Sequence, residues 1–426
     1  MKEDFLHYLW KFQKFNTGNL TTTNAQRLTV LAPGQHNHNA GPDFFNAQLL
    51  IDGQRWAGNV EIHIKASHWF AHAHQEDETY QSVILHVVWE HDTDISRNDG
   101  TPIPTLALQP LVPNAILSTY RKLFSQSKCW IPCEEQLPRI DDFVRDHWLE
   151  RLYVERLERK SQALAQQLEG LGNNWEALLF QLLCKNFGLK VNGEAFLSIA
   201  QSLPFSVVKK CAQHPQQLEA LLMGQAQLLD TSQGDEYYLL LRKEYQYLKH
   251  KFSIDSPATI PLKFFRLRPS SFPTIRLSQL AQLYASRHSL FSEVMSANHL
   301  HKYYELFSVE ASAYWTRHYT FGVPSSIRKK QLTKAFVDLL ILNTLIPLRF
   351  SFAAYQGRDE TNTLLELVQK LPAEDNRVIR NFATLNVPVK NAQQSQALLQ
   401  LKNDYCDKVQ CLQCAIGNSI LAQGPK

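Results

Sequence analysis

The chain has 426 residues, more than one compact hydrophobic core usually organises, so we expect two or more domains. Its hydrophobic fraction of 44% and charged fraction of 20% are those of a globular protein and exclude a disordered or fibrous chain. The net charge of +4 permits a nucleic-acid partner without requiring one. No stretch approaches the ~20 consecutive apolar residues of a membrane helix, and the first residues lack the apolar segment of a signal peptide. A cytoplasmic protein without a membrane partner is expected.

Residues 1–128 have the pattern of an α/β domain. Residues 3–15 place apolar side chains at helical spacing. Four short β-prone runs, separated by Gly, Pro, Asn and Asp, follow at 28–31, 44–51, 58–64 and 83–89. Short strands of this kind, with a helix before them, predict an α/β domain.

Residues 129–426 have a helical pattern instead. The first helical runs are at 143–171, 175–187 and 193–202, and others continue to residue 355. A Pro- and Ser-rich stretch at 257–273 is the expected place for a division within this region. The predicted architecture is therefore an N-terminal α/β domain followed by a long, mostly α-helical region.

Acids and histidines gather between residues 43 and 86. Nine of the 16 histidines fall in the first hundred residues, which favours metal binding or acid–base chemistry there. In the segment 58–65, strand alternation puts Glu61, His63 and Lys65 on one face and apolar side chains on the other. Because the apolar face packs against the core, the polar face must look into a cleft or into solvent.

Asp52-Gly53 predicts a hairpin turn between Asp43 and Glu61. A two-residue loop would pair Asp43 with Ile62, whereas a loop one residue shorter or longer would place it opposite Glu61 or His63. The sequence leaves this register open. In either of the last two registers, Asp43 and Glu61 form a site for Mg²⁺ or Mn²⁺, beside which a base or ammonium group can orient the attacking water.

These features resemble the PD-(D/E)XK nuclease superfamily: a helix carrying Glu3, then Pro42-Asp43 on one strand and Glu61 on the next. The resemblance implies a restriction-endonuclease-like mixed sheet, a metal ion on Asp43 and Glu61, and hydrolysis of phosphodiester bonds in nucleic acid. It also implies a lysine two residues after the second acid. His63 stands at that position and Lys65 lies two residues further, so either one is the candidate for activating water.

The whole chain also resembles a bacterial protein family that has no assigned activity. The likeness is carried by stretches such as 58–63, 83–88 and 266–269. This resemblance implies a family and no reaction.

The loop after residue 65 offers a second set of ligands. His72, His74 and Glu78 have the spacing of a cupin motif, in which two histidines and a glutamate bind a transition metal. A His-based, cupin-like metal enzyme is therefore an alternative function, although the flanking glycines of a cupin are missing. We otherwise expect His72 and His74 to border the cleft with Asp77, and His86 to be either a cleft residue or a hydrogen-bonded core residue.

Cysteines near the C-terminus predict a second metal site. Seven cysteines without an export signal favour reduced thiols or metal ligands over disulfides. Cys406, Cys411 and Cys414 are spaced as three corners of a zinc or iron–sulfur site. Cys133 or Cys129 is the expected fourth ligand, and free buried thiols are the alternative.

Basic residues of the helical region are candidates for binding phosphate. They are Arg266, Arg268 and Arg276, for which a solvated surface is the alternative interpretation. The principal alternative to a nuclease is a non-catalytic nucleic-acid-binding or scaffold protein that keeps the nuclease-like fold. The histidine at position 63, where the superfamily has lysine, favours that alternative.

Overall fold

The computed structural model describes residues 1–37, 39–125, 129–255 and 259–423. The chain forms two compact units, and the first consists of Met1–Leu149, Arg380–Pro388 and Leu399–Lys426. The second consists of Glu150–Ile379 and Val389–Leu398. The C-terminal segment thus belongs to the first unit. Residues 126–128 and 256–258, which adjoin or overlap the divisions expected at 128/129 and 257–273, lie outside the described residues.

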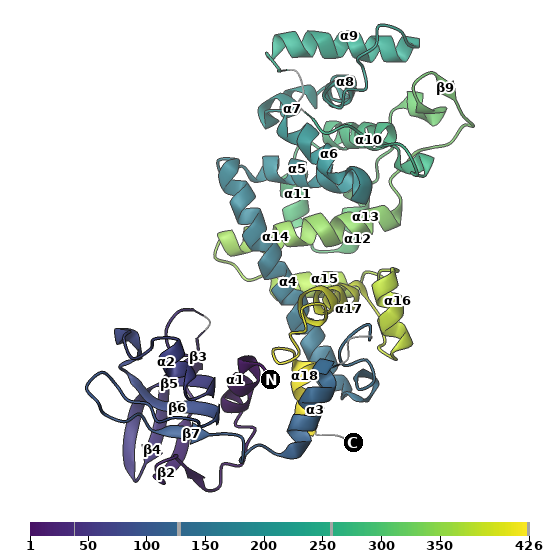
Figure 1. The fold of residues 1–426 in the computed structure, drawn as a ribbon. Helices are drawn as coiled ribbons and strands as arrows, with labels where there is room; N and C mark the ends of the chain where they lie inside the picture. The colour runs from purple at the N-terminus through teal and green to yellow at the C-terminus, as the bar shows by residue number, and fades with distance from the viewer. Residues whose placement is uncertain (38, 126–128, 256–258, 424–426) are drawn as a thin grey trace. The chain divides into compact units, whose positions relative to one another are not determined.

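A mixed sheet forms the core of the first unit (Figure 1). Its strands are β1 (Leu20–Thr21), β2 (Arg27–Ala32), β3 (Gln35–His36), β4 (Phe44–Ile51), β5 (Gln54–Lys65), β6 (Val83–Glu90) and β7 (Thr105–Ala107). The order is β1-β2-β4-β5-β6-β7, with β3 paired to β4. Strands β1 to β5 pair antiparallel, and β5, β6 and β7 pair parallel. The predicted mixed sheet is confirmed.

Helix α1 (Glu3–Lys11) covers the sheet beside β5. Its buried side chains include Phe5, Leu6, Leu9 and Trp10, the apolar residues that the helical spacing predicts to form one stripe. The two acids in its first turn, Glu3 and Asp4, lie at the positive end of the helix dipole, where negative charge stabilises the helix. The sequence pattern of residues 3–15 therefore gives both the helix and the face that it buries.

The turn between β4 and β5 has the conformation that its sequence predicts. Asp52 and Gly53 both have positive φ, 48° and 82°, as a two-residue type I′ hairpin loop requires. No atom lies within 4 Å of a Cβ built on Gly53, so the backbone angle and not the available space favours glycine there.

A β-bulge changes the register further along this hairpin. The pairing shifts between residues 44 and 47, where Asn46 has a φ of 58°. Beyond the bulge Phe44 pairs with Val60, so the next positions along the two strands are Asp43 and Glu61. Of the registers that the sequence leaves open, the bulge selects the one that places both carboxylates on the same face.

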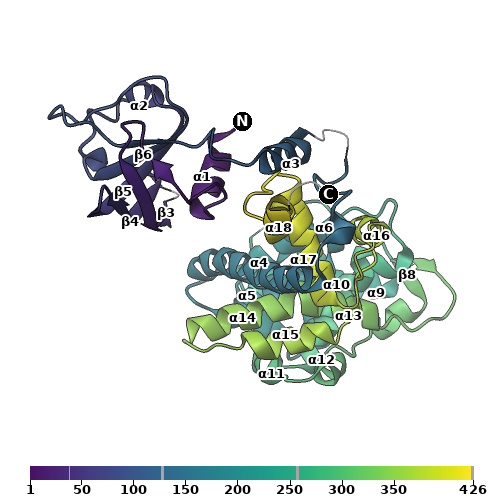
Figure 2. The same cartoon turned by 90° about the horizontal axis from the view of Figure 1, so that it is seen from below.

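The rest of the described chain is mainly helical, as predicted. The helices after the sheet are α3 (Asn114–Ser125), α4 (Asp142–Gly170), α5 (Trp175–Phe187), α6 (Leu189–Gln201), α7 (Phe205–Cys211), α8 (Pro215–Gln225), α9 (Glu236–Lys251), α10 (Pro273–Ser286), α11 (Leu290–Ser296), α12 (Leu300–Leu306), α13 (Lys334–Leu340), α14 (Ile346–Tyr355), α15 (Thr361–Gln369), α16 (Arg377–Thr384), α17 (Ala392–Gln400) and α18 (Ala415–Gln423). A small hairpin, β8 (His318–Thr320) and β9 (Val323–Pro324), interrupts them. Within the first unit, α18 packs beside α3 (Figures 1 and 2).

One helical segment of the second unit, Lys334–Tyr355, is long and apolar enough to cross a membrane when judged by length and composition alone. It runs through α13, a π-helical turn (Ile341–Leu345) and α14. Of its most apolar window, 72% is buried inside the protein. A core helix of a soluble protein has the same composition, and burial accounts for it here.

Candidate metal centre

Glu61 and Asp43 hold each other in place across the β4–β5 hairpin. The Glu61 side chain is buried, and its Oε2 accepts a hydrogen bond from the Asp43 backbone N–H at 3.1 Å. Asp43 Oδ2 accepts one in turn from the backbone N–H of Ile62 at 3.0 Å. This reciprocal pair brings the two predicted carboxylates together and leaves Oε1 of Glu61 free to face other groups.

Two histidines face that oxygen, and a third lies against one of them. His63 Nε2 lies 3.5 Å and His74 Nε2 lies 3.3 Å from Glu61 Oε1. His72 Nδ1 lies 3.1 Å from His63 Nε2. One ring nitrogen from each histidine lies within 4.8 Å of the others, the only such group of His, Cys, Asp or Glu ligand atoms found in the described part of the chain. We call Glu61, His63, His72 and His74 the histidine cluster.

A reversal of the backbone after β5 brings His72 back to His63 and His74 back to Glu61. Helix α2 (His68–Ala71) is followed by His72 as its C-cap residue. Ala73 then has a φ of 57°, in the left-handed region that costs a residue other than glycine about 1–3 kcal/mol. The N–H of His74 next bonds to the carbonyl of Trp69 at 3.1 Å. Strain of this kind is commonly kept where two side chains must point to one place.

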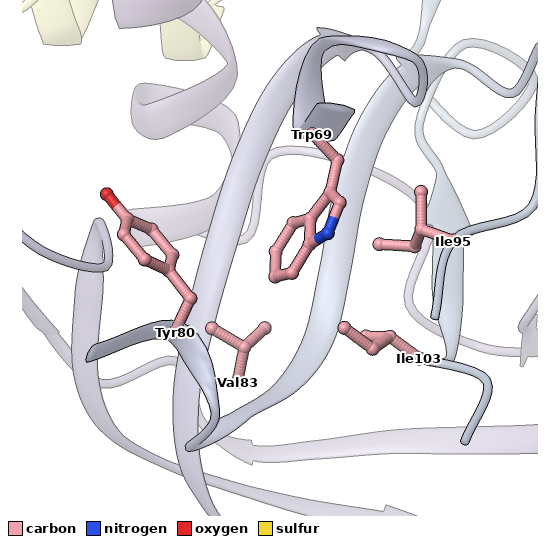
Figure 3. Close-up of a cluster of buried hydrophobic side chains, with 5 residues drawn as sticks. All are labelled: Trp69, Tyr80, Val83, Ile95 and Ile103. Atoms are coloured by element: carbon pink, nitrogen blue, oxygen red, sulfur yellow. The ribbon is translucent and has the colours of Figure 1, made fainter. Parts of the chain in front are cut away.

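A group of buried apolar side chains includes two rings that contact His74 (Figure 3). The group consists of Trp69, Tyr80, Val83, Ile95 and Ile103. Tyr80, which ends the short 3₁₀ helix Glu78–Tyr80, stacks on His74 with ring centroids 3.8 Å apart. The Trp69 ring meets the His74 ring nearly edge-on at 5.4 Å. These rings fix the orientation of His74 and keep water away from one side of the site.

His86 on β6 contacts the ring nitrogen of His63 that faces away from the cluster. It is fully buried, pairs in register with Glu61, and places its Nε2 2.9 Å from His63 Nδ1. If His63 Nε2 is to offer a lone pair to the cluster, His63 Nδ1 must carry the proton and donate it to His86. A hydrogen-bond partner that fixes the tautomer is the usual companion of a metal-ligating histidine. His86 is therefore a positioning residue.

Burial sets the charge state of these groups. It raises the pKa of Glu61 to about 7, against the hydrogen bond from His74, and the charge of Asp43 raises that pKa further. Burial, with the neighbouring imidazoles, lowers the pKa of His63 to about 2 and that of His86 to about 3. Both imidazoles are neutral at pH 7, as metal ligation requires, and a bound cation would favour the ionised form of Glu61.

Metal-free protein should lose stability as the pH falls below 6.5. Between pH 6.5 and 4.5 the unfolded chain binds protons at His63 and His86, whereas the folded chain binds one only at Glu61. The difference is about one proton, or roughly 1.4 kcal/mol per pH unit in favour of unfolding, and it rises to about two protons below pH 4.5.

Urea unfolding of EDTA-treated protein at several pH values measures this effect. A His86→Leu variant removes one of the two histidines, so its unfolding midpoint should change little between pH 6.5 and 4.5. A parent midpoint that stays constant or rises on acidification would contradict the assignment of neutral buried imidazoles.

Lys65 is not brought to the cluster. It is the last residue of β5, and its Nζ lies 3.8 Å from Glu90 Oε2, with both side chains about half exposed, at 46% and 52%. His63, two residues after Glu61, occupies the position that the nuclease superfamily gives to lysine. Strand twist and the exposed end of β5 thus separate two residues that alternation alone places on one face.

His7 of α1 joins the site without having been singled out in the sequence. Its Nε2 lies 3.2 Å from Asp43 Oδ2. Burial lowers its pKa, but the hydrogen bond and charge of Asp43, together with the charges of Glu3 and Asp4, raise it more. The effect of Glu3 on the site is therefore to raise the pKa of His7, which in turn contacts Asp43. The signal in the sequence was a histidine one helical turn after two acids, next to an apolar stripe.

The predicted cupin set does not form as such. His72 and His74 come together, but Glu78 is exposed at the start of its 3₁₀ helix, and Glu61 supplies the carboxylate instead. Asp77 is also exposed and accepts hydrogen bonds from the N–H and hydroxyl of Thr79, so it caps that helix.

The three candidate arginines differ in exposure. Arg266 and Arg268 are exposed. Arg276 is buried in α10, where its guanidinium lies 3.8 Å from the centre of the Phe336 ring and bonds to Gln279 at 3.0 Å. Arg276 therefore helps to pack the helical unit and does not face a phosphate at the surface.

A buried carboxylate in contact with two histidines, with a third histidine beside one of them, defines a candidate metalloprotein on a mixed sheet. The chain belongs to the family described as "Protein of unknown function (DUF2851)", which matches residues 3–377. The matched region contains the entire histidine cluster and ends before Cys406. No curated protein and no solved structure matches the chain.

Proposed function

We propose that the first unit is a metal-dependent hydrolase that cleaves phosphodiester bonds in nucleic acid. The observation that carries this proposal is the grouping of His63, His72 and His74, two of which face Glu61, beside the second carboxylate of Asp43. Three imidazoles and a carboxylate suit Zn²⁺, Mn²⁺ or Fe²⁺ better than Mg²⁺, which prefers oxygen ligands. The proposed ion is therefore a transition metal, and of the two ions expected from the sequence only Mn²⁺ fits well.

The residues around the site have distinct roles in this proposal. A divalent ion here supplies a water of lowered pKa and positive charge for the phosphate. Asp43, whose side chain is 23% exposed at the margin of the cluster, can accept the proton of that water. His7 beside it favours the carboxylate form. His72 is exposed, so we infer that substrate enters on its side.

The order of elements around the two acids is the reason for proposing phosphodiester hydrolysis over other reactions. As in the nuclease superfamily that the sequence resembles, a helix packs against antiparallel strands carrying the acids, and a further strand follows. His63 stands at the position of the superfamily's lysine, and in this proposal it is a metal ligand. The exposed Arg266 and Arg268 give the helical unit groups that can contact phosphates.

Metal reconstitution tests the proposal. Protein stripped with EDTA is reloaded with Mn²⁺, Zn²⁺, Mg²⁺ or, anaerobically, Fe²⁺, and is given bis(p-nitrophenyl) phosphate, single- and double-stranded DNA, and RNA. We expect a transition metal to restore cleavage of at least one substrate and Mg²⁺ to restore less. Cleavage that persists without metal would overturn the proposal.

A non-catalytic nucleic-acid-binding protein is the second candidate, favoured by the ion pair that keeps Lys65 on Glu90. Without an ammonium group at the acids, the fold would bind nucleic acid and not cut it. This candidate predicts that metal binds, that no substrate is cleaved, and that Glu61→Gln leaves nucleic-acid affinity unchanged in fluorescence anisotropy.

A further inference from the structure

Four cysteines from distant parts of the sequence meet within the first unit. Cys133 comes after α3, whereas Cys406, Cys411 and Cys414 precede α18. Each is buried, with 6–9% of its surface exposed, and all four line one apolar pocket. The charges of Cys411 and Cys414 raise the pKa of Cys133, and the charge of Cys133 raises that of Cys406, although burial is the larger cause. Cys129, the alternative fourth ligand, is exposed.

The backbone folds tightly around the last two of these cysteines. A Cβ on Gly417 would lie only 2.0 Å from the carbonyl oxygen of Cys411, so the loop can close on the first turn of α18 only with glycine there. The N–H of Cys414 points back to the same carbonyl at 3.4 Å. The loop from Cys411 to Cys414 is thus folded tightly against α18.

Hydrogen-bond donors surround the sulfur of Cys414. Burial raises its pKa, but the backbone N–H groups of Gly417 and Ile416 donate hydrogen bonds toward its sulfur. The buried indole N–H of Trp148 has no oxygen or nitrogen acceptor among the described residues and also favours the thiolate. None of the side chains lining the pocket is positively charged, and only the charge of Lys402 is seen to act on Cys406, so four thiolates there would need a further cationic partner.

We propose that Cys133, Cys406, Cys411 and Cys414 ligate an iron–sulfur cluster. The spacing of the last three, with four and then two residues between them, is that of plant-type ferredoxin ligands. Zinc at ~2.3 Å from four sulfurs would hold them about 3.8 Å apart. A single zinc ion would need all four sulfurs that close, and the ferredoxin-type spacing favours a cluster instead.

The cluster would join the C-terminal segment to the part of the first unit around Cys133. It shares no ligand with the histidine cluster, so this inference stands whether or not the proposed hydrolysis is found. Thiolates in an apolar pocket are also protected from exchange with water, as a stable cluster requires.

Chemical analysis of full-length protein purified without oxygen tests the inference. We expect iron and acid-labile sulfide in matching amounts, with a brown colour and visible absorption. Sulfide distinguishes a cluster from iron bound at the histidines. Zinc without sulfide, or neither iron nor zinc at the cysteines, would overturn the proposal.

Substitutions locate the cluster. Cys133→Ser and Cys414→Ser should each lower the sulfide content at least tenfold, whereas the exposed Cys129→Ser should keep it. Because a serine variant can fail to fold, the unmodified protein is also exposed to air and a chelator. Loss of visible absorption should then make residues 399–423 sensitive to protease, and a segment equally resistant before and after would contradict the cross-link.

Discussion

Replacing Glu61 by glutamine should lower kcat/KM for phosphodiester cleavage by about 10²- to 10⁴-fold and remove the bound transition metal. The amide can still accept the hydrogen bond from the Asp43 N–H, which is 3.1 Å from the carboxylate in the structure. It carries no charge, however, so it cannot balance a divalent cation next to His63 and His74. Kinetics with Mn²⁺ and metal analysis of the same sample measure both effects.

The fold of this variant should survive. Since burial raises the pKa of Glu61 to about 7, roughly half of the metal-free molecules already carry a neutral side chain at pH 7. Glu78→Gln is the matched control, because it neutralises an exposed carboxyl group in the loop that carries His74. A Glu61→Gln variant that binds metal and cleaves as the parent does would refute the proposed centre.

His63→Ala should greatly reduce activity, whereas Lys65→Ala should leave it almost unchanged. His63→Ala removes a ligand whose Nε2 lies 3.5 Å from Glu61 Oε1, so we expect metal binding to fall and cleavage to drop by about 10²-fold or more. Lys65→Ala breaks only an exposed ion pair with Glu90, worth about 0–1 kcal/mol. Its activity should stay within about threefold of the parent.

The comparison identifies which residue has replaced the superfamily's lysine. Because an alanine at position 63 leaves a cavity beside His86, His63→Gln is measured as well, and circular dichroism checks that each variant is folded. Equal losses in the His63 and Lys65 variants would show that the lysine reaches the reaction centre in solution and that the ion pair with Glu90 is not maintained.

Local sequence patterns determined the elements of this protein. Helical spacing gave α1 and its buried stripe, and alternation in residues 58–65 gave a strand with Glu61 and His63 on one face. Asp52-Gly53 gave the hairpin turn because few other pairs of residues accept positive φ twice in succession. These features depend on neighbours a few residues apart, so they can be read from the chain itself.

The tertiary structure alone decided which side chains meet. The bulge at Asn46 set Asp43 beside Glu61, although the turn by itself would pair it with Ile62. The left-handed Ala73 turned His72 toward His63 and His74 toward Glu61, and the parallel pairing of β6 brought His86 next to His63. Strand register and loop path follow from packing between residues far apart in the sequence, because each local segment is compatible with several of them.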